Sequence, residues 1–435
     1  MTIKDRVKTA LSLATDTKYF ESGRGVLDKV PEVFGRYFPG RVPIVIADCN
    51  TWKAAGERVF ALLSEAGMKP QKFLIPDREF HAEWKYVEMI DKVLDGGGVA
   101  VSVGSGTIND LCKLSSAHHK QSYLSVATAA SVDGYTSFGA SITFEGAKQT
   151  FECPAPVACL ADADVLCSAP KELTAAGYAD LAAKIPAGAE WMIADFIGTE
   201  PIIPDAWHPL QDCIDDILAN AEAVAAGDPE AIGAVFDGLA LSGFGMQTAR
   251  SSRPASASDH LFSHIMDMTH HKFNGKYVSH GFQVAIGTLT MCKVFENFFK
   301  LDLTRIDVDK CTAAWPSLES EQKRALDIFK DFPVPELGYR EITKKYEPAE
   351  KVRQELTRLK AQWPDFRKKL MDQLYTFDDM QEKFRIVGAP AKPEDIGCTK
   401  DDIIAMFPFV QLMRYRINLF DLAKRAGVYD EIIKI

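Results

Sequence analysis

The sequence predicts an N-terminal α/β domain built on a parallel sheet over residues 1–168, followed by an all-α domain over residues 169–435. Three observations predict this division. Short apolar runs alternate with helical stretches over the first ~165 residues, a glycine-rich turn follows one of these runs, and long helical segments dominate from residue 169 onward. The chain has 435 residues and 47% hydrophobic content, which is enough for two hydrophobic cores.

The N-terminal part contains strand-like runs separated by amphipathic stretches. The runs lie at residues 43–50, 72–77, 98–106 and 122–131, and the helical patterns lie at residues 51–67, 79–97 and 107–119. This alternation implies a parallel sheet covered by helices. Ligands of such sheets bind beyond the carboxyl ends of the strands, where Asp48, residues 104–107 and residues 128–133 would lie.

The C-terminal part is interpreted as one helical domain that binds metal and substrate. Its long helical segments lie at residues 171–198, 209–227, 229–249, 260–273 and 282–300. Charged helices then alternate with proline-containing breaks to the end of the chain. No internal repeat is present, so a solenoid is not expected.

Composition argues against several classes of partner. The net charge of −10 disfavours nucleic acid and anionic membranes as partners. Nine cysteines without a CxxC pair indicate a reducing compartment. The N-terminus does not resemble a signal peptide, and no apolar run approaches the length of a membrane-spanning helix. We therefore expect a cytoplasmic protein.

The turn GSGTIND at residues 104–110 follows the apolar run VAVSV and precedes a helical pattern. A helix N-terminus with uncovered backbone N–H groups binds a pyrophosphate, so this position favours a Rossmann-like nucleotide site. The motif has only two of the three fingerprint glycines, and glycine pairs also close ordinary turns.

Asp48 could bind an adenosine ribose or cap the helix that follows it. Asp133 could contact substrate or belong to a plain Asp-Gly turn.

Asp180, His260 and His280 are the candidate metal ligands. One carboxylate and two imidazoles make an oxygen/nitrogen site for a divalent cation, with coordination left open for substrate. Asp180 could instead form a surface ion pair with Lys184 one turn later, and the histidines could be polar residues of partly buried helices. Small apolar residues surround Asp180, so we expect a buried helix face whose charges need partners. His264 lies one turn after His260, where it could face substrate. A nucleotide turn combined with this ligand set indicates a metal-assisted dehydrogenase.

Eight segments along nearly the whole chain match, in order, the pattern of one enzyme family. The chain resembles the sn-glycerol-1-phosphate dehydrogenases, within the group of iron-containing alcohol dehydrogenases, glycerol dehydrogenases and dehydroquinate synthases. The segments are ADCNTWKAAG (47–56), VGSGTINDLCK (103–113), VATAASVDGYTS (126–137), AGYADLAAK (176–184), SRPASASDHLFSH (252–264), SHGFQVAIGT (279–288), GAPAKPEDIG (388–397) and RYRINLFDLAKRAG (414–427). The Ser-Arg-Pro stretch points to the glycerol-1-phosphate branch.

The resemblance implies roles for the matched positions, with Asp180, His260 and His280 as the metal ligands. Asp133 matches an acidic residue near the substrate hydroxyls, and Arg253 and Lys184 are candidates for the substrate phosphate or the polarised oxygen. Asp133, His264 and Lys184 are the catalytic candidates. The implied cofactor-binding residues are Asp48 at the adenosine end, Gly104, Ser105, Gly106 and Thr107 in the pyrophosphate loop, Asp110 in the same turn, and Thr128 and Ser131 on the nicotinamide side.

Three departures from the family pattern flank the predicted site. Ala179 replaces a glycine before Asp180, and residues 257–259, Ala-Ser-Asp, replace Gly-Ser-Glu before the first histidine. The segment IPAGAEW after Lys184 also differs. The ligand set is intact, and the exact substrate stays open.

The resemblance implies a dehydroquinate synthase-like fold and a metal-dependent dehydrogenase that uses NAD or NADP to interconvert dihydroxyacetone phosphate and sn-glycerol 1-phosphate. Zinc is the first expectation for the metal, with nickel or iron as alternatives. A small phosphorylated triose or glycerol is the expected substrate, and a homodimer is the expected assembly. The alternatives are a polyol dehydrogenase on an unphosphorylated substrate, a cyclising lyase of the dehydroquinate synthase type, and a non-catalytic binding protein. Aspartate at position 180, where the synthases have glutamate, argues against the lyase.

Overall fold

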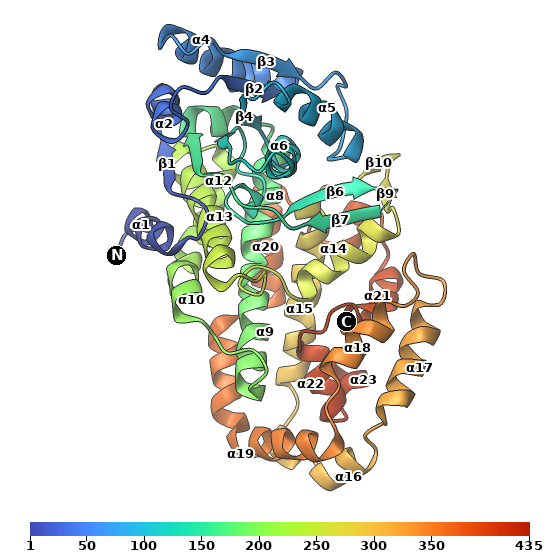
Figure 1. Ribbon diagram of the computed structural model, residues 1–435. Coiled ribbons are helices and arrows are strands. Elements are labelled where there is room, and N and C mark those ends of the chain that lie inside the picture. Colours follow the sequence, from blue (N-terminus) through green and yellow to red (C-terminus); the bar gives the residue numbers. More distant parts are fainter. Residues whose placement is uncertain (146) are drawn as a thin grey trace. The chain divides into compact units, whose positions relative to one another are not determined.

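In the computed structural model, which describes residues 1–145 and 147–435, the chain forms two compact units. Unit 1 comprises residues 1–181, 204–252 and 386–389, and unit 2 comprises residues 182–203, 253–385 and 390–435. Figure 1 shows the elements of both units, most of them labelled. The units are discontinuous in sequence, whereas the predicted domains are contiguous ranges. The predicted boundary between residues 168 and 169 therefore stays a prediction.

An all-parallel sheet of six strands forms the centre of unit 1. The strand order is β1–β8–β5–β4–β2–β3. The strands are β1 (Tyr19–Gly23), β2 (Pro43–Ala47), β3 (Gln71–Leu74), β4 (Val99–Gly104), β5 (Leu124–Ala127) and β8 (Ala158–Asp162). Between β2 and β4 the chain switches direction across the sheet: β3 is added on one side of this point, and β5 and β8 are added on the other. Parallel sheets of this kind bind ligands at such a point.

Both faces of this sheet are covered by helices. Val45 and Val101 point to one face, where they pack with α2 (Val30–Tyr37) and α4 (Glu57–Glu65). On the opposite face, Ile44 and Ile46 pack with α5 (Trp84–Leu94) and α6 (Gly106–His118), and this α5–α6 layer is visible beside the sheet in Figure 1. Because neither face meets water, the central strands are apolar at nearly every position rather than alternating.

The rest of unit 1 consists of helices and one β-hairpin. Helix α13 (Pro229–Ala249) is its longest helix and packs against α1 (Ile3–Leu13), α7 (Ala163–Ser168) and α10 (Pro204–Gln211). The remaining elements are α3 (Cys49–Thr51), α8 (Lys171–Ala182), α11 (Ile214–Leu218), α12 (Ala221–Ala226), β6 (Ala140–Phe144) and β7 (Ala147–Phe151). The predicted helical segment 209–227 is therefore divided among three short helices, whereas the segment 229–249 is one continuous helix.

Unit 2 is helical apart from a short hairpin of β9 (Lys272–Phe273) and β10 (Lys276–Tyr277). Its core is rich in aromatic residues, with Phe262, Phe407 and Phe420 in successive ring contacts. The helices are α9 (Lys184–Ile197), α14 (Ser258–Met268), α15 (His280–Phe299), α16 (Val308–Ala313), α17 (Leu318–Phe329), α18 (Leu337–Lys345), α19 (Ala349–Gln373), α20 (Phe377–Val387), α21 (Lys400–Leu412), α22 (Leu419–Arg425) and α23 (Tyr429–Ile432).

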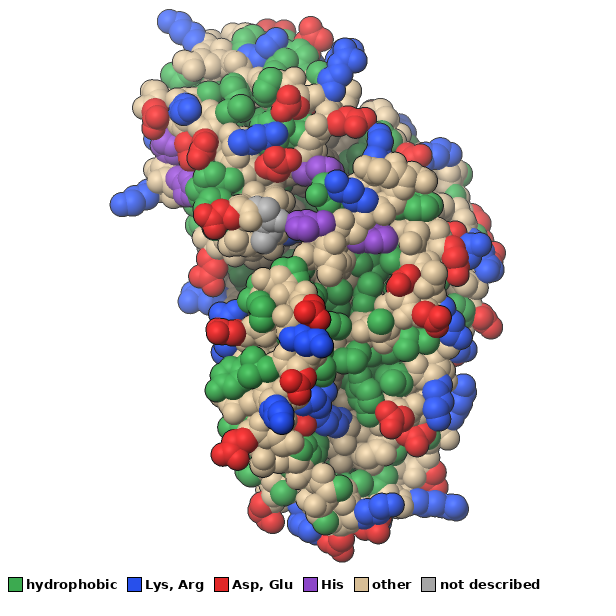
Figure 2. Space-filling view, turned by 90° about the vertical axis from the view of Figure 1, so that its right-hand side faces the viewer, with side chains coloured by type: hydrophobic (Ala, Val, Ile, Leu, Met, Phe, Trp, Pro, Cys, Tyr) green, Lys and Arg blue, Asp and Glu red, His purple; other side chains and the backbone are tan. Residues whose placement is uncertain are grey.

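No helix in the described ranges is long and apolar enough to cross a bilayer. On the face shown in Figure 2, acidic and basic side chains are intermixed. That face lacks the continuous basic area with which proteins bind polyanions.

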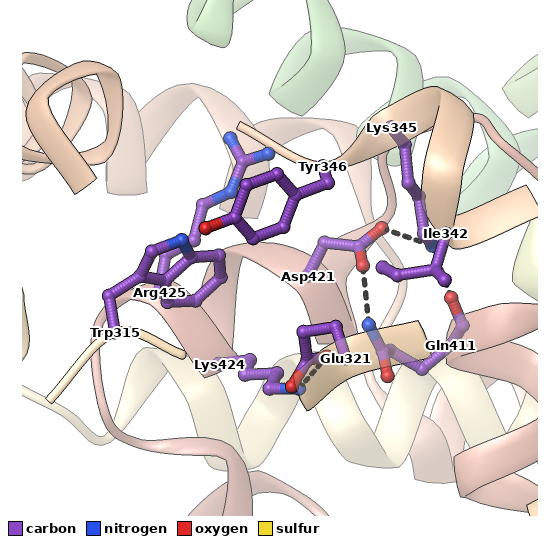
Figure 3. Close-up of a pocket in the computed structure, with 9 residues that line it drawn as sticks. All are labelled: Trp315, Glu321, Ile342, Lys345, Tyr346, Gln411, Asp421, Lys424 and Arg425. Atoms are coloured by element: carbon purple, nitrogen blue, oxygen red, sulfur yellow. Dashed lines mark hydrogen bonds and ion pairs between the residues drawn. The ribbon is translucent and has the colours of Figure 1, made fainter. Parts of the chain in front are cut away.

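A small cavity in unit 2 is lined by paired charges (Figure 3). The Lys345 ammonium is buried and donates to Asp421 Oδ2 at 2.9 Å and to the Gln411 backbone oxygen. Asp421 also accepts from Gln411 Nε2 at 2.7 Å, and Lys424 pairs with Glu321. Burial lowers the pKa of Lys345. These side chains pair their charges and hydrogen-bonding groups with one another. The residues that line the cavity therefore form a structural ion network that joins α17, α18, α21 and α22.

Replacing Lys345 with methionine will destabilise unit 2, because it leaves the Asp421 carboxylate buried without its ammonium partner. Breaking a buried pair from one side costs about 3 kcal/mol or more. The neighbouring Lys344 is a matched control, since its side chain is 57% exposed and pairs with Glu341. Lys344→Met should change the free energy of unfolding by less than about 1 kcal/mol. Equal urea midpoints for the two variants would contradict the structural role.

Candidate metal and substrate site

The predicted nucleotide turn lies between β4 and α6. Ser105 is the N-cap residue of α6, and its side chain makes no capping hydrogen bond. A Cβ on Gly104 would lie 2.4 Å from Ile108 Cβ, and one on Gly106 would lie 2.7 Å from Val132 Cγ1. The turn therefore packs too tightly for side chains at these two glycines. Thr107 follows in the first turn of α6, where backbone N–H groups can bind a pyrophosphate.

Asp48 and Asp110 both make internal contacts. Asp48 Oδ1 accepts from the N–H groups of Asn50 at 2.7 Å and Thr51 at 2.9 Å, which is the predicted helix-cap arrangement. Asp110 lies 3.3 Å from Lys113 Nζ and accepts from the Ser141 N–H at 3.1 Å. Burial raises the pKa of Asp110. The adenosine contact of Asp48 and the cofactor role of Asp110 stay predictions.

The segment after β5 carries Thr128, Ser131 and Asp133. The Thr128 N–H donates to the Gly104 oxygen at 3.1 Å, which places this segment beside the nucleotide turn. Ser131 Oγ lies 3.5 Å from the Tyr135 hydroxyl. The Asp133 backbone N–H donates to Asp180 Oδ2 at 2.9 Å, and its carboxylate accepts from Ser242 Oγ at 2.9 Å. The backbone of Asp133 thus helps to orient a candidate metal ligand.

Helix α8, which carries Asp180, approaches this segment very closely. A Cβ on Gly177 would lie 1.9 Å from the Ala130 backbone oxygen and 3.0 Å from Ser131 Cα. Only a glycine permits this approach without a shift of the backbone. Asp180 lies three residues after Gly177 on the same face of α8, so the same approach brings its carboxylate to the Asp133 N–H.

The two candidate histidines are oriented by hydrogen bonds through Nδ1. His260 Nδ1 contacts Asp259 Oδ2, and His280 Nδ1 lies 3.0 Å from Ser263 Oγ. Ser263 donates its hydroxyl proton to Gln283 Oε1 at 2.7 Å, so it accepts from His280 Nδ1–H. Both imidazoles therefore carry the Nδ1 proton, which makes Nε2 the nitrogen with a lone pair suited to a metal.

Asp180, His260 and His280 each offer one ligand atom within 4.8 Å of the others. Asp180 and His260 are buried and His280 is partly buried. The two imidazole rings lie 5.3 Å apart between centroids, in an edge-to-face arrangement. This donor set and its tautomers fit a divalent cation that keeps further positions for substrate.

A second glycine brings the helices of the two histidines together. A Cβ on Gly287 of α15 would lie 2.1 Å from the Asp259 backbone oxygen of α14. Because α14 carries His260 and α15 begins at His280, this close crossing sets the spacing of the two imidazoles.

Lys184 and Arg253, the candidates for binding the substrate phosphate or the polarised oxygen, lie in unit 2. Lys184 is fully buried at the first position of α9. Arg253 is 2% exposed, and its Nη2 donates to the backbone oxygens of Glu190 at 2.6 Å and Ile417 at 3.2 Å. Its Nε lies 3.4 Å from Glu200. The structure therefore holds the Arg253 guanidinium with protein groups, and its contact with a substrate phosphate stays a prediction.

Sequence reasoning missed Arg414, Ser263 and Lys113. Arg414 Nη2 donates to His264 Nε2 at 2.9 Å, a contact between residues 150 apart in sequence. Lys113 Nζ donates to the Gly134 oxygen at 2.8 Å and so supports the segment that carries Asp133. All three lie inside the matched segments, but nothing in their local pattern distinguishes them from ordinary surface or helix residues.

The sequence profile of the family described as iron-containing alcohol dehydrogenase matches residues 21–170. The glycerol-1-phosphate dehydrogenase (NAD(P)+) of Geobacillus thermodenitrificans is 30% identical over 308 residues, which cover 69% of this chain and 76% of the relative. The enzyme of the same name from Pyrococcus horikoshii is 33% identical over 270 residues, which cover 62% of this chain and 76% of the relative.

Solved structures show the same fold at low identity. Glycerol dehydrogenase from Schizosaccharomyces pombe aligns with a TM-score of 0.62 and 17% identity, covering 97% of this chain and 90% of that one. The iron-containing alcohol dehydrogenase from Thermococcus thioreducens aligns with a TM-score of 0.60 and 13% identity, covering 97% of this chain and 99% of that one. At these identities the likeness concerns the fold alone.

Gly177→Ala will lower both stability and metal affinity, because the added methyl group would overlap the Ala130 carbonyl and push α8 away from Asp133. Overpacking of this kind costs about 1–3 kcal/mol. The matched control is Gly233→Ala in α13, where an added Cβ would meet nothing within 4 Å. That change should be neutral or stabilise by up to ~1 kcal/mol. Thermal melting with and without added zinc measures both effects, and similar curves for the two variants would refute the positioning role of Gly177.

Proposed function

We propose that this chain, which belongs to the glycerol-1-phosphate dehydrogenase family, interconverts dihydroxyacetone phosphate and sn-glycerol 1-phosphate with NAD or NADP. Family membership makes it an oxidoreductase acting on a CH–OH group. The observation that carries the proposal is the convergence of Asp180, His260 and His280, with both histidines presenting Nε2.

The metal and the cofactor would be held by separate groups of residues. Asp180, His260 and His280 would hold the divalent cation, for which zinc is our first choice. The turn Gly104–Thr107 would hold the pyrophosphate, and Thr128 and Ser131 would line the nicotinamide side. When bound, the cation supplies Lewis-acid stabilisation of negative charge on the substrate oxygen, and the nicotinamide supplies or accepts the hydride.

The chain's own side chains orient these groups and handle the proton. Asp259 and Ser263 fix the histidine tautomers, and the Asp133 N–H fixes the Asp180 carboxylate. His264 lies one turn beyond His260 on α14 and is our candidate for transferring the proton. Asp133 and Lys184 are the other candidates for contacting the substrate oxygens.

We also propose that the protein works in the cytoplasm as a homodimer and supplies glycerol 1-phosphate for phospholipid biosynthesis. All nine cysteines are free thiols, which suits a reducing compartment. Burial raises the pKa of Cys112, Cys159 and Cys292 to about 12, so these thiols are chemically inert. The dimer and the pathway rest on the family resemblance.

Zinc-loaded protein will oxidise one NADH or NADPH for each dihydroxyacetone phosphate reduced, and chiral analysis will identify the product as sn-glycerol 1-phosphate. The value of kcat/KM should exceed that for unphosphorylated dihydroxyacetone by at least ~100-fold, since charge-assisted contacts with the phosphate orient the substrate. Removing the metal with a chelator should abolish turnover, and zinc should restore it.

Three outcomes of this assay would contradict the proposal in different ways. Equal or better turnover of dihydroxyacetone would indicate a polyol dehydrogenase. Product formation without net NAD(P)H consumption would indicate a synthase-type lyase, which regenerates its cofactor. Binding of nucleotide and metal without turnover of any triose would indicate a non-catalytic protein.

A further inference from the structure

We propose that Arg414 recognises the substrate phosphate and is the residue that selects phosphorylated over free trioses, an inference that rests on the proposed function. Arg414 lies two residues after the end of α21, in a small cavity of unit 2. The cavity is also lined by Arg253, Arg416, Ser256 and Ser258. The Ser258 hydroxyl already donates to Glu190 Oε1 at 2.8 Å. The three arginines and the Ser256 hydroxyl remain as donors that suit an oxyanion.

The three arginines differ in what they already bind. Arg253 donates to two backbone oxygens, and both Arg253 and Arg416 lie within 4 Å of the Glu200 carboxylate, at 3.4 and 3.7 Å. Arg414 instead contacts neutral acceptors, Ser256 Oγ at 3.3 Å and His264 Nε2 at 2.9 Å. Among residues 1–145 and 147–435 it forms no ion pair. A phosphate oxygen is a stronger acceptor than either neutral partner, so Arg414 is the arginine of this cavity best placed to gain from an anion.

Arg414 is a buried cation whose acidic neighbours neutralise its charge only in part. Burial and then the nearby Arg416 charge lower its pKa to about 10, so it remains a cation at neutral pH. The acidic groups acting on it are Asp259, which is engaged with His260, and Glu341. Glu190 also lines the cavity, but burial raises the pKa of that carboxyl to about 7, so it is only partly ionised at neutral pH.

The position of Arg414 relative to the metal ligands matches the shape of the substrate. His264 lies one helical turn from His260, so their Cβ atoms are about 5–6 Å apart, and Arg414 contacts His264 directly. In dihydroxyacetone phosphate one methylene and one ester oxygen separate the carbonyl carbon from the phosphorus. A carbonyl bound at the His260 end can therefore extend its phosphate past His264 to the Arg414 guanidinium. His264 would lie between the two ends of the substrate.

The test compares dihydroxyacetone phosphate with dihydroxyacetone in zinc-loaded Arg414→Met at saturating NADPH. KM for dihydroxyacetone phosphate should rise on the order of 100-fold, because a charge-assisted contact is lost. KM for dihydroxyacetone should change by no more than about 3-fold, since this substrate has no phosphate to bind. Any loss of kcat through His264, which Arg414 contacts, should be the same for both substrates. The matched control is Arg385→Met, an exposed arginine of α20 that contacts Glu382 and Gln381. It should leave both substrates unaffected.

Arg414→Lys covers the case in which the methionine variant does not fold, because it keeps the positive charge. It loses the paired donors, so KM for dihydroxyacetone phosphate should rise about 10-fold, and inorganic phosphate should inhibit it more weakly than the unmodified enzyme. An unchanged KM for dihydroxyacetone phosphate, or an equal rise in KM for both substrates, would overturn the role of Arg414. Failure of the unmodified enzyme to reduce dihydroxyacetone phosphate would instead refute the proposed function.

Discussion

The structure depends on the burial of the Asp180 carboxylate beside two imidazoles. Asp180 is 0% exposed, and an ionised carboxylate removed from water must be compensated. One backbone N–H, from Asp133, supplies part of that compensation. The imidazoles of His260 and His280 each offer a nitrogen within 4.8 Å of a carboxylate oxygen of Asp180. The divalent cation that we propose for Asp180, His260 and His280 would satisfy all three donors at once.

Much of the surrounding architecture serves to hold these donors. Gly177 lets α8 approach the segment after β5, and Gly287 lets α15 cross α14 at close range. The histidine rings are then fixed through Nδ1 by Asp259 and by Ser263. The positions that need glycine therefore lie about one and two helical turns from the candidate ligands, and each controls the placement of a helix that carries one.

The sequence predicted the central strands because a sheet covered on both faces produces continuous apolar runs, as in β2 and β4. It did not predict β1, whose residues Tyr19–Gly23 are mixed in polarity and half-buried at the sheet edge. It also did not predict β8 (Ala158–Asp162), which is buried throughout between β1 and β5. The predicted helix over residues 171–198 is two helices, α8 and α9, which meet at Ala183. Three residues later Pro186 occupies the first turn of α9, where a missing N–H costs nothing.

The candidate ligands could be predicted because Asp and His residues in apolar surroundings are rare and chemically specific. The residues that orient these ligands could not be predicted from the sequence. Ser263 and Gln283 orient His280 through the packing of α14 on α15, and Arg414 reaches His264 from 150 residues away. Contacts of this kind depend on tertiary packing, so they become visible only once the helices are placed. The cap formed by Asp48 shows the converse, since its partners are two and three residues away and were anticipated.

The X-ray absorption spectrum of the zinc-loaded protein reports directly on the ligands of the metal. We expect two imidazole nitrogens at about 2.0–2.1 Å together with oxygen ligands, and one imidazole fewer in His280→Ala. A zinc environment without imidazole, or a spectrum unchanged by the loss of His280, would contradict the assignment of Asp180, His260 and His280 as the metal ligands.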